Sequence, residues 1–198
     1  MKDIEELHSN LLTYKILYVL KLNESLRVPT IAELINGSIH LLQDLQEHDL
    51  IAYKASNFYT NSNHMILTYK GYKLLENMLL KLFKIDSTDI KILNYINTNI
   101  NTSTLDILND LCSVIDEHYG VRYSYLIDTI IKESTSQKVN IFQNGFINYN
   151  CSYEDLICNK VDETDIILTI SNSGISILNM YLGYINFVNE MNIKFGVN

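Results

Sequence analysis

A short motif that occurs twice constrains the fold of this chain more than any other feature. Its first copy is Leu67-Thr68-Tyr69-Lys70-Gly71, and its second copy is Ile170-Ser171-Asn172-Ser173-Gly174. In each copy a hydroxyl residue follows an apolar segment, and a glycine stands three residues later, ahead of an amphipathic stretch. Because Ser and Thr side chains accept hydrogen bonds from the N–H groups of a first helical turn, both copies predict a strand that leads into a capped helix. The sequence therefore predicts two modules that share the same order of elements.

The segment before the first motif begins with two predicted helices. Residues Asn10–Leu22 carry apolar side chains at the spacing of a helix with one buried face. Thr30 and Glu33 fit a capping box, so we expect a short second helix over residues Ile31–Ile35.

A third helix and a hairpin complete the first module. Asn36-Gly37 predicts a tight turn, and Ser38 then opens a third helix. Asp49 stands where a left-handed residue would end that helix, a conformation that Asp tolerates better than most non-glycine residues. The apolar segments Ile51–Lys54 and Met65–Leu67 enclose a polar stretch, which predicts a hairpin with a polar tip.

This order of parts resembles the winged-helix proteins, and in particular small bacterial regulators of the MarR and PadR type. The resemblance covers residues 9–83, and it is carried by Asp49-Leu50-Ile51 before the hairpin and by the first motif after it. It implies an α+β, mainly helical fold in which the hairpin is a wing and the third helix enters the DNA major groove. The alternative is an unrelated α+β domain.

The second half repeats the order with longer parts. Lys91–Ile96 echoes Lys15–Leu20 at an offset of 76 residues, whereas Gly174 follows Gly71 by 103. We therefore predict tandem winged-helix modules with small β-hairpin wings, over residues 1–84 and 85–198, although coincidence is an alternative. The parts expected in the second module are a long helix (Leu105–His118), a recognition-type helix (Tyr123–Glu133), strands over Lys138–Phe142 and Phe146–Tyr149 around the turn Asn144-Gly145, an acidic insertion (Cys151–Asp165) and a closing strand (Asp165–Ile170).

The residues that could carry catalysis or bind a metal form no familiar pattern. None of the five histidines lies in a His-Glu-x-x-His arrangement or near a closely spaced cysteine pair, and no Gly-x-Ser-x-Gly motif occurs. We expect neither an enzyme nor a cofactor. Three scattered cysteines argue against a disulfide framework. No apolar stretch is long enough for a bilayer span, so we expect a cytoplasmic protein that does not enter the membrane.

The balance of basic and acidic residues indicates which module is the better candidate for binding DNA. Residues 1–83 hold 8 basic and 9 acidic residues, and residues 84–198 hold 7 and 14. Phosphate contacts need basic residues, so the first module is favoured. The polar residues that we expect to meet DNA from the third helix are Ser38, His40, Gln43 and Gln46, and those from the wing are Lys54, Asn57, Asn61, Asn63 and His64.

The predicted last helix, Gly174–Met191, is apolar around most of its circumference. A helix of this kind is buried on more than one side, so we expect a second copy of the chain to cover it. The alternative is a central helix enclosed by both modules of one chain. The residues that we expect at the dimer interface are Leu178, Tyr181, Leu182, Ile185 and Val188.

Two functions follow from these observations. The first is a dimeric transcriptional regulator whose first module binds an operator in DNA. The second is an adaptor that dimerises and binds another protein, because acidic tandem winged-helix proteins of this size resemble the kleisin-binding subunits of bacterial chromosome-condensing complexes, the ScpB and MukE type.

Overall fold

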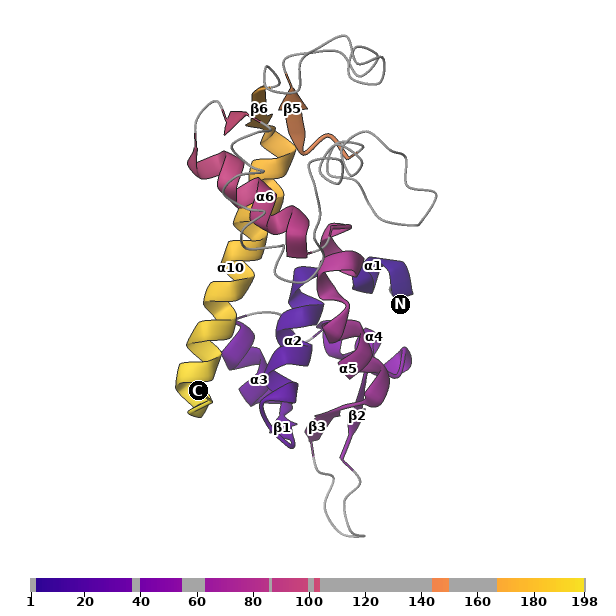
Figure 1. Cartoon of the computed structure of the whole chain (residues 1–198). Helices are drawn as coiled ribbons and strands as arrows, with labels where there is room; N and C mark the ends of the chain where they lie inside the picture. The colour runs from indigo at the N-terminus through magenta and orange to yellow at the C-terminus, as the bar shows by residue number, and fades with distance from the viewer. Residues whose placement is uncertain are drawn as a thin grey trace, which may run out of the picture. The chain divides into compact units, whose positions relative to one another are not determined.

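The computed structural model describes residues 3–36, 40–54, 63–85, 87–99, 102–103, 144–149 and 167–197. It is mainly helical, with two small antiparallel sheets (Figure 1). The chain divides into two compact units, one made of residues 1–84 and 181–198 and the other of residues 85–180. Residues 181–198, which were expected in the second module, belong to the first unit.

Six helical elements form most of the first unit, together with the second half of the last helix. They are α1 (Ile4–His8), α2 (Leu11–Lys21), α3 (Val28–Ile35), α4 (His40–Glu47), α5 (Tyr69–Glu76) and the π-helical turn η1 (Leu79–Phe83). Helix α2 contacts α3, α5 and the sheet, and most of its residues are buried. It begins where the sequence predicts, because the Oδ1 atom of Asn10 accepts a hydrogen bond of 3.0 Å from the N–H of Leu12.

Helix α3 begins earlier than the sequence analysis predicted. Its first residue is Val28 and its N-cap is Arg27, so the capping box expected at Thr30 does not form. Pro29 lies in the first turn, where its missing N–H removes no intrahelical hydrogen bond. The helix ends at Asn36, which has a left-handed backbone (φ 47°). Pro29 is thus part of a helix start.

The sheet of the first unit has three strands in the order β1-β3-β2 (Figure 1). Strands β2 (Ile51–Tyr53) and β3 (His64–Leu67) are the predicted antiparallel pair. Strand β1 (Leu26–Arg27), which the sequence analysis did not predict, pairs with the other side of β3, with Leu26 opposite Met65 and Arg27 opposite His64.

The sheet of the second unit repeats this order and register. Its strands β4 (Thr102–Ser103), β6 (Ile167–Ile170) and β5 (Ile147–Tyr149) lie in the order β4-β6-β5. The offset of 76 carries β1 onto β4, and the offset of 103 carries β3 onto β6. Each residue pair of the first sheet then has its counterpart in the second, since Thr102 lies opposite Leu168 and Ile147 opposite Ile170.

Two helices flank the second sheet along the chain. Helix α6 (Ser87–Thr98) precedes it, and the long helix α10 (Asn172–Phe195) follows it. The first half of α10 belongs to the second unit and the remainder belongs to the first. The expected helices Leu105–His118 and Tyr123–Glu133, the strand Lys138–Phe142 and the whole acidic insertion Cys151–Asp165 lie outside the described residues.

The repeated motif has the same geometry in both units. In the first, the Oγ1 atom of Thr68 accepts a hydrogen bond of 3.1 Å from the N–H of Gly71 and donates to the carbonyl of Asp49 at 2.6 Å. In the second, the Oγ atom of Ser171 accepts from Gly174 at 3.1 Å and donates to the carbonyl of Gly145 at 2.6 Å. The hydroxyl thus caps a helix and also holds the chain that enters an edge strand, β2 in the first unit and β5 in the second.

In each unit, the carbonyl that accepts the hydrogen bond from Thr68 or Ser171 belongs to a residue with a left-handed backbone conformation. Asp49 has φ 60° and Gly145 has φ 67°. The left-handed conformation predicted for Asp49 is therefore present. Gly145 occupies the corresponding position ahead of β5, next to Asn144 in the predicted turn.

The core of the first unit lies between α2, α4 and the sheet. The apolar spacing of the predicted helices and strand places six leucines of this unit in one core, and of these Leu67 and Leu75 are half-buried. The other four are buried, namely Leu17, Leu20, Leu42 and Leu45. Helix α10 completes this core, because Tyr184 packs edge-on against Tyr18 with ring centroids 6.3 Å apart.

Candidate functional site

The outer face of α4 carries the polar residues that the sequence analysis singled out. Leu41, Leu42 and Leu45 point into the core, so His40 and Gln43 are exposed and Gln46 is half-buried. The amide Nε2 of Gln43 donates a hydrogen bond of 3.0 Å to the carboxylate of Glu47 one turn later. Gln43 is a residue that we expect to contact a base edge. The negative charge of Glu47 beside it weakens the attraction of this face of α4 for phosphate.

The structure brings three basic or titratable side chains into a row across the sheet. Arg27 on β1 lies opposite His64 on β3, and the N–H of Lys54, just after β2, donates to the carbonyl of His64 at 2.8 Å. Met65 is buried, so the alternation of the strand places His64 on the outer face. Residues opposite each other share a face, and Arg27 and Lys54 therefore flank His64.

This cross-strand row of Arg27, His64 and Lys54 was predicted in part. The sequence analysis named Lys54 and His64 from the hairpin but did not name Arg27, because a strand of two residues leaves no periodic pattern. The apolar residue Leu26 before Arg27 was the sole available signal. Ser38, Asn57 and Asn61 lie outside the described residues, and Asn63 is exposed next to the row.

The second unit has no counterpart of this row at the corresponding described positions. Ser103 stands where the first unit has Arg27, and Ile167 stands where it has His64. The side chain of Ile167 is 37% exposed. The charge of the whole units differs in the same sense: the first holds ten basic and ten acidic residues, and the second holds five and thirteen.

The predicted dimer residues lie on different sides of α10. Leu178 is buried within the second unit, so the structure contradicts a role for it at an exposed interface. Tyr181 is half-buried and contacts Phe83 edge-on, with ring centroids 6.2 Å apart. Ile185 and Val188 are half-buried, and Leu182 is 42% exposed. Apolar residues occur around most of the circumference of this helix. The sequence therefore could not show which of them are covered by the rest of the same chain.

Burial is the largest cause of the pKa shifts of three side chains in the first unit, His8, Tyr14 and Tyr184. The pKa of His8 is lowered by burial and, after that, by the charges of Lys81 and Lys84. Burial also raises the pKa of the phenols of Tyr14 and Tyr184, which therefore stay neutral. Positive charge from Lys81 and Lys84 thus lies near His8.

Neither a metal-binding cluster nor a membrane-spanning helix occurs among the residues that the structure describes. No group of three or more His, Cys, Asp or Glu side chains there could hold a metal ion. Within the same residues, no helix has both the length and the apolar character required to cross a membrane. Comparison of the chain with protein-family models, with curated proteins and with solved structures gives no match.

Proposed function

We propose that this chain is a non-enzymatic, winged-helix DNA-binding protein whose first unit binds duplex DNA. The order of its elements, α2-β1-α3-α4-β2-β3-α5, and its strand order β1-β3-β2 support the winged-helix assignment. In this assignment α4 is the recognition helix and the loop between β2 and β3 is the wing.

The cross-strand row at the base of the wing is the observation that carries this proposal. Arg27 and Lys54 are exposed cations on either side of His64. Contacts to phosphate supply most of the affinity of a DNA-binding protein and set its register on the duplex. His40 and Gln43 on α4 then offer hydrogen-bonding groups for base edges, and Gln is a good partner for adenine.

A gel-shift assay against fragments of the source genome, at low and moderate salt, tests the proposal. Replacing Lys54 or Arg27 with Ser removes a phosphate contact, so binding weakens on all fragments and the salt slope falls by about one. Replacing Lys194, an exposed lysine on α10, with Ser is the matched control and leaves affinity unchanged.

Specificity is tested separately from affinity. Gln43→Ala removes a candidate base contact, at a cost of about 1–3 kcal/mol on the preferred fragment and less on the others. Equal affinities for the parent, Gln43→Ala and Lys54→Ser would overturn the DNA proposal. Lys160, in the acidic insertion, is not expected to matter.

The second unit favours a different kind of partner. Ile167 and Ser103 replace the basic residues of the row, and the unit holds thirteen acidic residues against five basic ones. We infer a protein-binding module, as in an adaptor that dimerises and binds a kleisin. Titration calorimetry with a kleisin fragment from the same genome tests this: Ile167→Asp should abolish binding, and an Ile167→Asp variant that binds like the parent would exclude this surface.

A further inference from the structure

A second basic surface lies on the first unit, along α5 and η1. We call it the α5–η1 face and define it by the exposed residues between Tyr69 and Lys84. These residues are Tyr69, Lys70, Tyr72, Lys73, Glu76, Asn77, Leu80, Lys81 and Lys84. They recur every three or four residues, so that they form a continuous strip along the helical elements.

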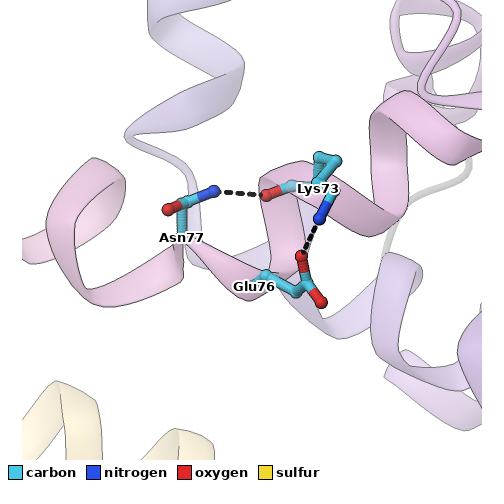
Figure 2. Close-up of polar contacts among 3 residues, drawn as sticks. All are labelled: Lys73, Glu76 and Asn77. Carbon is cyan, nitrogen blue, oxygen red and sulfur yellow. Dashed lines mark hydrogen bonds and ion pairs between the residues drawn. The ribbon is translucent and has the colours of Figure 1, made fainter.

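The α5–η1 face is strongly positive for a chain of net charge −8. It carries four lysines and one glutamate. This glutamate, Glu76, accepts a hydrogen bond of 2.8 Å from the Nζ atom of Lys73 (Figure 2). The side-chain amide of Asn77 donates a hydrogen bond to the backbone carbonyl of Lys73. Lys70, by contrast, donates to the backbone carbonyl of His48 at 2.8 Å and keeps its charge uncompensated by that contact.

Aromatic rings alternate with these lysines. The side chain of Tyr69 is 77% exposed and that of Tyr72 is 37% exposed. The Nζ atom of Lys73 lies 5.8 Å from the ring centroid of Tyr69, and Lys21 from α2 lies 5.6 Å from that of Tyr72. Such an exposed ring offers a flat surface on which a nucleobase can stack.

The electrostatic environment of His8 supports the same picture. Burial lowers the pKa of His8 first, then Lys81 and Lys84 lower it further, with a smaller contribution from Lys70. The charge of Glu5 acts in the opposite sense but does not reverse the shift. Lysines from both ends of the α5–η1 face therefore contribute to one positive region.

We infer that the α5–η1 face binds single-stranded nucleic acid, with phosphates on its lysines and a base stacked on Tyr69. This surface is separate from the cross-strand row. Helix α5 follows the Leu67 end of β3, whereas the row lies at His64, about 10 Å away at the usual rise of a strand. An acidic peptide would use the lysines but would leave the tyrosine rings without a stacking partner.

Fluorescence anisotropy of a labelled oligothymidylate of about 12 nucleotides, titrated with the full chain, tests this inference. Tyr69→Ala should weaken binding roughly tenfold, because one stacked base is lost. Lys81→Ser with Lys84→Asn should weaken binding and reduce its salt dependence. Asn is chosen at position 84 because Lys84 has a left-handed backbone (φ 58°).

Matched controls come from the same chain. Tyr53→Ala removes an exposed ring from β2, and Lys194→Ser removes an exposed lysine from α10, so neither should change binding. Melting temperatures show that each variant is folded. Arg27→Ser with Lys54→Ser should lower duplex binding and leave oligothymidylate binding intact, which keeps the test independent of the proposed duplex site.

Four outcomes would overturn the inference. The parent chain could fail to bind the oligonucleotide at low salt, or Tyr69→Ala could bind as the parent does. Polyglutamate that competes as well as unlabelled oligothymidylate would show a surface for acidic protein segments instead. Equal losses from the row variant and the α5–η1 variants would show one shared surface.

Discussion

Gly71 and Gly174 occupy positions at which any side chain would meet a backbone carbonyl. A Cβ atom on Gly71 would lie 2.1 Å from the carbonyl oxygen of Leu50, and one on Gly174 would lie 2.2 Å from that of Phe146. Neither oxygen can move without moving the strand that follows it. The glycines are therefore required by the close approach of a helix start to the chain entering the edge strand, β2 or β5.

Replacing either glycine with alanine tests this requirement. Gly71→Ala forces the backbone apart and should lower the free energy of unfolding by about 1–3 kcal/mol or more. Gly183→Ala on α10 is the control: a Cβ atom there meets nothing within 4 Å, so it should raise stability by about 0.5–1 kcal/mol. Urea unfolding measures both. A Gly71→Ala variant as stable as the parent would contradict the observed contact.

His8 supplies a pH-dependent prediction. Its pKa in the folded chain is lowered from 6.5, so the unfolded chain binds more protons in the range just below that value. The contribution of His8 to stability is present above pH 6.5 and is lost as the pH falls through the folded pKa. His8→Gln should lose less stability than the parent between pH 7.5 and 5.5 in thermal melts. Parallel losses in both proteins would show that His8 is not coupled to folding.

At the scale of elements, α10 closes the core of the first unit with its second half. Phe187 and Met191 are buried, the Nζ atom of Lys15 lies 5.0 Å from the ring centroid of Phe187, and the hydroxyl of Tyr18 donates to the Oδ1 atom of Asn192 at 2.7 Å. All these contacts join α2 to a segment more than 160 residues later in the chain. The first unit is therefore complete only when the last helix is present.

Substitutions on the two faces of α10 separate its roles. Phe187→Ala deletes a buried ring and should cost about 3–5 kcal/mol of stability. Ile193→Ala removes atoms from a side chain that is 83% exposed and should change stability by less than about 0.5 kcal/mol. Chemical unfolding of the full chain compares them. Equal stabilities would show that this half of α10 does not close the first unit.

At the scale of the whole molecule, the exposed face of α10 leads to a prediction about assembly. Leu182 and Ile193 remain exposed in a single chain, and because they are eleven residues apart they lie on the same side of the helix. We expect a homodimer that covers this face, since two-fold dimers are the commonest assembly. Light scattering should give twice the mass of one chain, and Leu182→Asp with Ile193→Asp should give one chain mass while both units stay folded. A monomeric parent at micromolar concentration would exclude the dimer.

Several features were predictable from sequence because their physics is local. A hydroxyl that caps a helix and a glycine three residues later act within one turn, so the motif at Thr68 and Ser171 could be read directly. The same holds for α2, whose apolar spacing shows its buried face, and for Asp49, whose left-handed backbone follows from the end of a helix.

Other features depended on which distant segments meet. A strand of two residues such as β1 has no period, and its existence depends on pairing with β3 nearly forty residues later, so Arg27 could not be placed beside His64 from sequence. The apolar circumference of α10 showed that it needs neighbours, but helical spacing does not say which ones. Tertiary structure decided that Tyr184, Phe187 and Met191 close the first unit, because burial depends on packing partners that helical periodicity does not encode.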